Sequence, residues 1–227
     1  MYLKTKDDKE DTTMARTATT TEAKDVTKDI KVRLTLMEPM LGTAPNDPEI
    51  YSRFIASKAP DAVSREQEIA TVGAEEYEEK QITIFRRDPN GNPIVMDYLI
   101  KGFFKNACSA LREVNSTKSS KLTSYKKKID GLVFIMDRMI PINFPEGTEM
   151  TICQRPLRAQ TAQGERVALA SSEQVPAGST LEFTIRCFNS TMAALVVEWL
   201  DYGQYNGLGQ WHNSGMGRFT WEDITDK

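Results

Sequence analysis

Alternation of hydrophobic and polar residues predicts the strands of this chain. Residues 30–36 place an apolar side chain at every second position, and residues 180–188 do the same. A period of two residues is typical of a strand with one buried face. Residues 131–136 form a continuous apolar run fit for a central strand, and residues 218–224 alternate and are rich in aromatic side chains. We therefore expect strands at these four places.

Apolar residues at helical spacing predict two main helices, over residues 98–113 and 191–203. In both segments they recur three or four positions apart, which places them on one face of a helix. These residues are Ile100, Phe104, Ala107 and Leu111 in the first segment, and Met192, Leu195, Val196, Trp199 and Leu200 in the second. Trp199 is therefore expected in the core, and Trp221 of the last strand is expected to pack against it.

Shorter signals predict smaller elements between these segments. Asp47-Pro48-Glu49 combines a capping residue with a proline suited to the first helical position, and Ser64 opens a second, acidic helix. The turn sequence at residues 88–91, Asp-Pro-Asn-Gly, predicts a hairpin between two apolar runs. The polar segment 154–164 is a candidate for a longer hairpin.

The order of the main elements predicts the fold class. Strand, helix, strand, strand, helix and strand make the βαββαβ order of an α+β, ferredoxin-like (RRM-like) fold, with an antiparallel sheet and two helices on one face. Residues 39–97 and 138–178 are then large insertions. Residues 1–28 mix charges and threonines with few large apolar groups, which is typical of a flexible tail. We expect residues 29–227 to form a single domain.

A glycine-rich loop separates the second helix from the last strand. Residues 207–219 read G-L-G-Q-W-H-N-S-G-M-G-R-F. Four glycines are costly in chain entropy unless the backbone adopts positive φ or something must approach it closely. The loop follows a helix and precedes a strand, whereas in a dinucleotide fold or a P-loop the glycine loop follows a strand and precedes a helix. The P-loop sequence Gly-Lys-Ser/Thr is also absent. The pattern therefore excludes an ATPase and a Rossmann enzyme.

The composition narrows the function classes. No run of eighteen apolar residues occurs, and the first residues lack an apolar signal segment, so we expect a cytoplasmic protein of a bacterial cell or a phage-infected host, without membrane contact. Three distant cysteines make a disulfide framework improbable. With one histidine and no CxxC, a zinc site is close to excluded, and we expect no metal and no cofactor.

The net charge of −3 divides unevenly along the chain. Residues 61–80 hold seven acidic residues against two basic ones, whereas residues 101–166 are rich in lysine and arginine. A local positive block is the electrostatic footprint of a partner that is a polyanion. A charge run of this kind is also typical of an ordinary solvated face, and the sequence leaves both interpretations open.

The loop and the first helix resemble a known family. The RAMP superfamily of CRISPR-associated RNA-binding proteins is built of ferredoxin-like units with a glycine-rich loop between the last helix and the last strand. Y-L-I-K-G-F-F-K-N-A-C-S-A-L-R is similar to the Lys-Gly opening of the first helix in the backbone subunits of CRISPR effector complexes. In those subunits, insertions at these two places form a web and a thumb around the nucleic acid. The stretch Q-R-P-L-R-A-Q-T-A-Q-G-E-R-V-A-L-A also resembles uncharacterised proteins of bacterial phages and prophages.

The residues themselves favour binding to a single strand. Lys101, Lys105 and Arg112 form one stripe on an ideal helix, where cations meet phosphates and release counterions. Glycines offer unobstructed N–H groups to a phosphate, and Trp211, Tyr205 and Phe219 offer rings for stacking. Trp211 suits ligand contact and packing equally. The candidate nucleic-acid-binding residues are Lys101, Lys105, Arg112, Lys118, Lys121, Lys126, Lys127, Lys128, Arg155, Arg158, Arg166, Gly207, Gly209, Trp211, His212, Gly215, Gly217 and Arg218.

Three functions therefore compete. The first is a non-enzymatic protein that binds single-stranded RNA or DNA and assembles along the strand as a homo-oligomer or in a larger nucleoprotein assembly. The second is a metal-independent endoribonuclease of the same fold, with His212 as general base helped by Tyr125 and residues 126–128. The third is a phage-encoded protein that binds a host protein through its acidic face. The sequence does not distinguish RNA from DNA.

Overall fold

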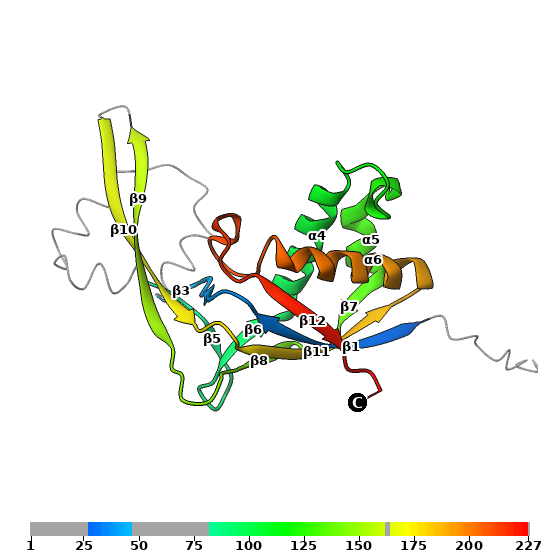
Figure 1. Cartoon of the computed structure of the whole chain (residues 1–227), viewed down its shortest axis with the longest axis horizontal. Coiled ribbons are helices and arrows are strands. Elements are labelled where there is room, and N and C mark those ends of the chain that lie inside the picture. The colour runs from blue at the N-terminus through cyan, green and yellow to red at the C-terminus, as the bar shows by residue number, and fades with distance from the viewer. Residues whose placement is uncertain (1–26, 47–81, 162–163, 227) are drawn as a thin grey trace, which may run out of the picture.

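An antiparallel sheet with helices on one face organises the chain (Figure 1). The computed structural model describes residues 27–46, 82–161 and 164–226. The strands of this sheet are β1 (Lys28–Leu36), β5 (Arg86–Arg87), β6 (Pro93–Met96), β7 (Val133–Ile135), β8 (Met139–Asn143), β11 (Thr180–Cys187) and β12 (Phe219–Asp223). The helices are α4 (Asp97–Leu111), α5 (Tyr125–Leu132) and α6 (Ser190–Asp201), with 3-10 turns η1 (Ser119–Lys121), η2 (Tyr202–Gln204) and η3 (His212–Ser214).

The strand order confirms the ferredoxin-like fold. β12 pairs with β1, β1 with β11, and β11 with β7, and every pair is antiparallel. The chain runs through these strands and the two main helices as β1, α4, β7, β11, α6 and β12, which is the predicted βαββαβ order. The predicted helices 98–113 and 191–203 are observed as α4 and as α6 followed by η2.

The second strand of this plan differs from the predicted segment 131–136. Gly131 and Leu132 close helix α5, which the sequence did not predict, and β7 begins only at Val133. After β7 the chain continues along the same edge of β11 as β8, which pairs with Thr180 and Leu181. Between β7 and β8, the carboxylate of Asp137 accepts a hydrogen bond from the Thr184 backbone N–H at 2.7 Å. A strand interrupted by a bulge therefore replaces the single short strand.

Both predicted hairpins are present. β5 and β6 pair across the Asp88–Gly91 turn, where Asp88 accepts from the backbone N–H groups of Asn90 and Asn92 and Gly91 has φ of 86°. The polar segment forms the long hairpin of β9 (Thr151–Thr161) and β10 (Gly164–Val175). In a second sheet, β10 also pairs with β2 (Met40–Leu41) and β4 (Thr83–Ile84), and β4 pairs with β3 (Ala44–Pro45).

The core lies between the main sheet and the helices. Phe104 of α4 and Trp199 of α6 are fully buried, with ring centroids 5.6 Å apart, and Phe103 packs edge-on against Phe219 of β12 at 5.2 Å. Trp199 is in the core as predicted. Trp221 packs against the core and donates to Asp201 at 2.8 Å. Buried aromatic rings therefore fix the positions of α4, α6 and β12, which surround the glycine loop.

Several predictions fall on residues that the structure does not describe. These are the tail up to residue 26, the two short helices expected near Asp47 and Ser64, and the acidic segment 61–80. Lys28, assigned to the tail, is the first residue of β1. Within the described ranges, no helix is long and apolar enough to cross a membrane. Cys108, Cys153 and Cys187 are free thiols.

Candidate nucleic-acid interface

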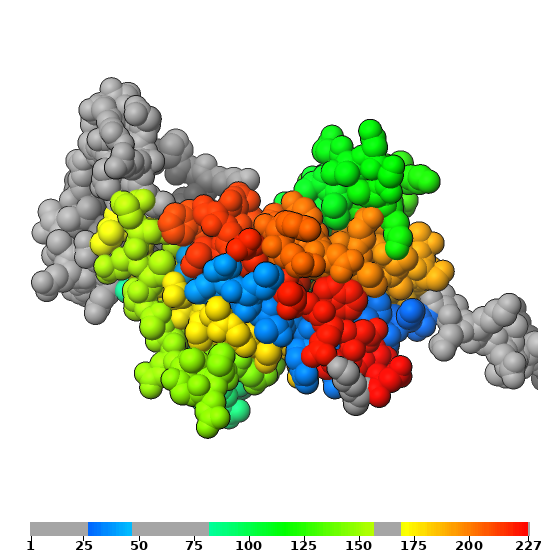
Figure 2. Space-filling model, viewed as in Figure 1, coloured from blue at the N-terminus to red at the C-terminus, as the bar shows by residue number. Residues whose placement is uncertain are grey.

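The glycine loop leaves η2 and returns to β12 folded against the rest of the chain. Its backbone is anchored by hydrogen bonds from Leu208 N–H to the Gly217 carbonyl at 3.0 Å and from Gly217 N–H to the Pro39 carbonyl at 2.8 Å. In Figure 2 the loop, in orange-red, lies between the blue segment that follows β1 and the yellow-green hairpin. The loop is therefore part of the packed structure and not a free surface flap.

Three of the four glycines are required by the chain's own packing. A Cβ on Gly207 would collide with the backbone at residues 216–218, and a Cβ on Gly217 would collide with the Leu208 carbonyl oxygen. A Cβ on Gly209 would lie 2.6 Å from the Leu41 carbonyl oxygen. Gly209, Gly215 and Gly217 also have positive φ, between 69° and 89°. At Gly207, Gly209 and Gly217, the close approach predicted from the sequence is thus made by other parts of the same chain.

Gly215 differs from the other loop glycines. Its φ is 89°, yet the nearest atom to an added Cβ is Arg218 Nε at 3.7 Å. The neighbouring Trp211 also lies in the left-handed region, with φ of 60°. Gly215 is therefore needed for backbone conformation alone, since an added Cβ would only touch the Arg218 side chain at ordinary contact distance.

Six N–H groups of the loop are already paired within the chain. The amides that donate to backbone carbonyls of the chain are those of Leu208, Gln210, Ser214, Gly215, Met216 and Gly217. A phosphate nest requires N–H groups that point outward without a partner. The predicted nest is therefore not formed from these six amides.

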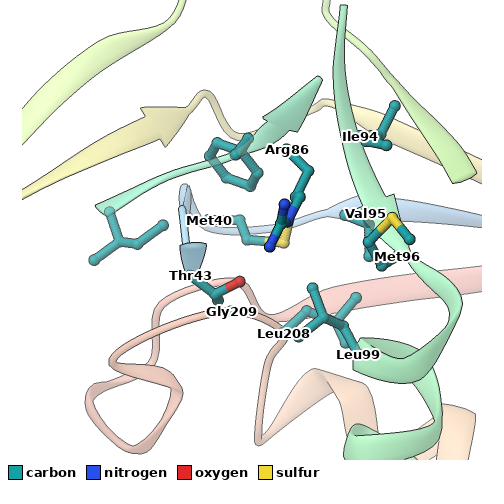
Figure 3. A pocket seen from close by; sticks show the side chains of 11 residues that line it. Met40, Thr43, Arg86, Ile94, Val95, Met96, Leu99, Leu208 and Gly209 are labelled. Carbon is teal, nitrogen blue, oxygen red and sulfur yellow. The ribbon is translucent and has the colours of Figure 1, made fainter. Parts of the chain in front are cut away.

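Leu208 anchors the loop beneath its surface. It is 3% exposed and meets Met40, Val95 and Leu99 around a cavity of about 10 Å³, as Figure 3 shows. That space is about the size of one water molecule. The first half of the loop is therefore held by apolar contacts with the β2 and β6 segments and with α4.

Trp211 and Arg155 connect the loop to the long hairpin. The Arg155 guanidinium lies 4.7 Å from the centre of the Trp211 ring and donates to Ser172 Oγ at 3.2 Å and Gln210 Oε1 at 3.0 Å. Arg155 is 7% exposed, whereas Trp211 is 41% exposed. A cation over an aromatic face stabilises the ring's position. Arg155, a predicted phosphate ligand, thus supports Trp211 and ties β9 to the loop.

The two remaining aromatic candidates have opposite environments. Phe219 is fully buried against Phe103, so the stacking role considered for it is excluded. Tyr205 is 74% exposed and lies beside Tyr202. Trp211 and Tyr205 are therefore the rings of the loop region that are open to a base.

Helix α4 carries the predicted basic stripe, and each cation has a neighbour. Lys105 forms an ion pair with Asp130 at 2.7 Å, and the Lys101 amine lies 4.5 Å from the centre of the Phe134 ring. Burial lowers the pKa of Lys101, and Asp130 opposes that shift. Arg112 stacks on Tyr125 at 5.1 Å. The stripe therefore faces α5 and remains partly exposed.

A second stripe of α4 faces the glycine loop. Tyr98, Gly102 and Asn106 follow one another at four-residue spacing and line a cavity of about 190 Å³, whose other wall is the loop from Gly207 to Gly209 together with His212. Both stripes border the exposed side of α4. One continuous surface thus joins the loop to the basic residues.

The lysines of residues 118–128 stand at the far end of α4. In Figure 2 the green segment around residue 120 projects above the orange surface of α6. Lys118 donates to the Ala194 carbonyl at 3.4 Å, and Lys128 to Thr123 at 3.5 Å. Lys121, Lys126 and Lys127 are exposed. Glu198 holds the base of the segment by accepting from Lys118 N–H at 2.6 Å and Ser119 N–H at 3.0 Å.

The other predicted cations lie apart from α4. Arg218 pairs with Glu38 at 2.9 Å beside the loop. Arg158 and Arg166 belong to the hairpin, where they pair with Val167 and Ala159 in the register of β9 and β10. Their side chains are outside the described set. The hairpin therefore contributes one described cation, Arg155, to the region of the loop.

The side chain of His212, a residue of the loop, lies beside Asn106 of α4. Its Nδ1 is 3.0 Å from the Gly209 carbonyl oxygen, and its Nε2 is 3.5 Å from the Asn106 side-chain nitrogen. Tyr125, a suggested helper in catalysis, is instead beside Arg112. Among the described residues, no three His, Cys, Asp or Glu side chains gather as a metal site would require.

Ion pairs lie on the face of the main sheet opposite the helices, which we call the helix-free face. Arg33 bridges Glu182 at 2.7 Å and Glu222 at 2.9 Å, and Arg186 pairs with Asp29 at 2.7 Å. The Arg186 guanidinium lowers the pKa of Asp29. RRM domains stack bases on aromatic residues of the central strands. The described residues of β1 and β11 on this face are polar or charged, so these two central strands offer no ring to a base.

Comparison with solved structures identifies the fold. A chain of a type III-B Cmr-beta complex, determined by cryo-EM bound to cognate target RNA, is similar over 87% of this chain with 10% identity and a TM-score of 0.52. This chain shares its fold with that subunit. The likeness agrees with the ferredoxin-like fold predicted from the order of the elements.

This likeness is one of structure and not of sequence. The chain spans 59% of the Cmr-beta chain that it matches. A chain of a type IV-B CRISPR complex is 12% identical, with 88% of this chain and 91% of that chain covered and a TM-score of 0.44. The sequence matches no protein-family profile and no curated protein.

Sequence reasoning missed Tyr98 and Asn106. They share one face of the predicted helix with Gly102, which the four-residue spacing makes visible. The sequence gives no sign that a loop a hundred residues later lies over that face. Only the fold brings His212 beside Asn106.

Proposed function

We propose that this chain is a non-enzymatic subunit that binds single-stranded RNA within a CRISPR-type nucleoprotein complex. The supporting likeness is to a chain of a complex solved with target RNA, with the fold shared over 87% of this chain. The observation that carries the proposal is the exposed side of α4. It joins a cavity beside the loop to the stripe of Lys101 and Lys105 and continues toward the lysines of residues 118–128.

The chemistry of this surface suits a strand better than a duplex. Trp211 and Tyr205 expose aromatic rings near the loop, and Lys101 and Lys105 stand further along the same helix. Stacking on exposed rings requires unpaired bases and contributes about 1–3 kcal/mol per base. Cations along the path neutralise phosphates, and counterion release then drives binding.

The test measures binding of labelled single-stranded RNA by fluorescence anisotropy at several salt concentrations. Replacing Lys101 and Lys105 by glutamine removes two cations, so the log–log salt slope should become shallower by about 1.4. The matched control, Lys28→Gln with Lys31→Gln on β1, removes the same charge and should leave the slope unchanged. Equal slopes for the two double variants, or absence of RNA binding at low salt, would overturn the proposal.

Two further arms separate the alternatives. Labelled RNA incubated with the protein and a chelator should stay intact; cleavage that His212→Ala abolishes would establish the ribonuclease instead. Single-stranded DNA and duplexes of equal length should bind more weakly than single-stranded RNA. A protein that binds none of these nucleic acids would favour the host-protein interaction.

Assembly along the strand is the last part of the proposal. On RNAs of increasing length, the mass of the complex measured by light scattering should rise in steps of one chain. A constant mass of one chain per RNA at every length would show that the chain does not assemble with copies of itself.

A further inference from the structure

Trp211 has a backbone conformation that is unusual for a large residue. Its φ is 60° and its ψ is 23°, in the left-handed region, where the Cβ lies too close to the backbone. The other described non-glycine residues with positive φ are two serines, Ser116 and Ser124. Strain of this kind persists only where the surrounding structure holds it, and it is concentrated at functional sites. The fold therefore keeps Trp211 in its place at a cost in free energy.

One face of the Trp211 ring is covered by Arg155. The guanidinium lies 4.7 Å from the centre of the ring, and a cation at a ring face is attracted by the electron density of the ring. Arg155 is 7% exposed, whereas Trp211 is 41% exposed. Since one face is covered, the exposed part of the ring is its other face and its edges. Arg155 thus keeps the ring in one orientation and is itself too deeply buried to meet a phosphate in solvent.

A cluster of hydrogen bonds holds Arg155 in turn. Its two terminal nitrogens donate to Ser172 Oγ at 3.2 Å and to Gln210 Oε1 at 3.0 Å. The hydroxyl groups of Ser172 and Thr83 each lie 3.4 Å from the same Gln210 oxygen and 2.7 Å from each other. Strands β9, β10 and β4 therefore meet the glycine loop at one cluster of polar groups, directly before Trp211 in the chain.

We propose that Arg155 is a positioning residue, which holds Trp211 as a fixed platform on which one base of the bound strand stacks. The platform accepts any base, because every base has a π face. A ring that is held in advance loses little side-chain entropy on binding, which improves affinity. Arg155 acts through the ring and contacts no phosphate. The inference rests on the proposed function, since the base belongs to the RNA that the subunit binds.

The test is a double-mutant cycle on the binding of single-stranded RNA, measured by fluorescence anisotropy. Trp211→Leu removes the aromatic face and should weaken binding at least about fivefold, as expected for the loss of one stacked base. Arg155→Met should also weaken binding, with an unchanged log–log salt slope, whereas loss of a phosphate ligand would make the slope shallower by about 0.7. The double variant should bind no more weakly than Trp211→Leu alone, because Arg155 acts through the ring.

Two further variants separate positioning from a general loss of folding. Gln210→Met removes the loop acceptor of Arg155 and should reproduce the effect of Arg155→Met, so it decides the question if Arg155→Met does not fold. Arg186→Met, the matched control, removes a paired arginine on the helix-free face and should leave RNA affinity unchanged. Circular dichroism and Tm establish that each variant is folded. Losses that multiply in the double variants, or a shallower salt slope in Arg155→Met, would overturn the inference.

A second measurement separates this inference from the proposed function. Adenosine monophosphate titrated into labelled protein should shift the indole N–H NMR signal of Trp211, which is identified by its absence in Trp211→Leu, and Arg155→Met should remove the shift. If no RNA binds, the proposed function fails, and this titration still decides whether the ring takes a base. If RNA binds but the losses in the cycle multiply, the platform is overturned while the subunit remains an RNA-binding protein.

Discussion

Gly215 and Gly217 provide a direct test of what the glycine loop does. Both have positive φ, 89° and 69°, but an added Cβ makes only an ordinary contact with the Arg218 side chain at Gly215, whereas at Gly217 it collides with the Leu208 carbonyl oxygen. Gly215→Ala should therefore carry only the strain of a left-handed alanine, about 1–2 kcal/mol. At a chain length near 230 residues this lowers Tm by about 2–8 °C.

Gly217→Ala should cost much more, because the loop must open to admit the methyl group. The opening breaks the hydrogen bonds that Gly217 makes with Leu208 and Pro39, each contributing about 0.5–1.5 kcal/mol. It also unseats the buried Leu208 side chain, whose full burial contributes about 1.5–3 kcal/mol. Together with the strain, the expected loss is about 4–8 kcal/mol, comparable with the whole stability of many domains.

Urea and thermal unfolding followed by circular dichroism measure these losses. Gly91→Ala is the matched control: Gly91 also has a φ of 86° with no atom near its Cβ, but it lies in the turn between β5 and β6. Gly91→Ala and Gly215→Ala should behave alike, and Gly217→Ala should be far less stable. Equal, mild effects at all three positions would refute the packing account. Loss of RNA affinity in folded Gly215→Ala would show that the ligand lies against the loop there.

Two further predictions concern other parts of the core. The Glu198 carboxylate accepts hydrogen bonds from the backbone N–H of Ser119 and from its hydroxyl group, the latter at 2.5 Å. Glu198→Ala removes this acceptor and should lower the free energy of unfolding, measured in urea, by about 2–4 kcal/mol. A change below about 1 kcal/mol would contradict the role of Glu198 as an anchor. At pH 8 a thiol reagent should label Cys153 quickly and Cys108 and Cys187 only after denaturation, because both are buried and burial raises the pKa of Cys187 to about 11; three fast thiols in the folded protein would refute this.

The βαββαβ core was predictable because each of its elements has one buried face. In β1 and β11 every second side chain is buried, as their alternation predicts. In α4 and α6 the apolar spacing corresponds to the buried residues. Once these elements are in order, the handedness and pairing rules leave few topologies. Local periodicity therefore carries most of the information about this part of the fold.

The region around α5 was not predictable by the same reasoning. Its sequence, Y-K-K-K-I-D-G-L, has a single fully buried residue, Ile129, and a glycine, so neither period is evident. The apolar residues that follow form β7, in which the exposed Phe134 pairs with Arg186 on the helix-free side of the sheet. Where the strand begins is decided by pairing with β11, which is distant in sequence.

The glycine loop illustrates the same limit for the candidate site. Its composition predicts positive φ or a close approach, and both are found, but the approaching atoms belong to Leu41 and Leu208 and not to a ligand. Both Trp211 and Phe219 were candidates for stacking from the sequence, but Trp211 is 41% exposed and Phe219 is fully buried. Composition identifies the need for space; only tertiary structure shows what fills it.

These contacts together locate the surface that remains for a partner. Six of the loop amides are paired within the chain, and Arg33 and Arg186 engage acidic residues on the helix-free face. Groups already paired in the folded protein gain little by exchanging one partner for another. The exposed side of α4 differs, because it presents a cavity, an amide and an imidazole at one end and partly exposed lysines further along. Binding energy for a strand is therefore expected to come from this helix, with the glycine loop acting as its rigid support.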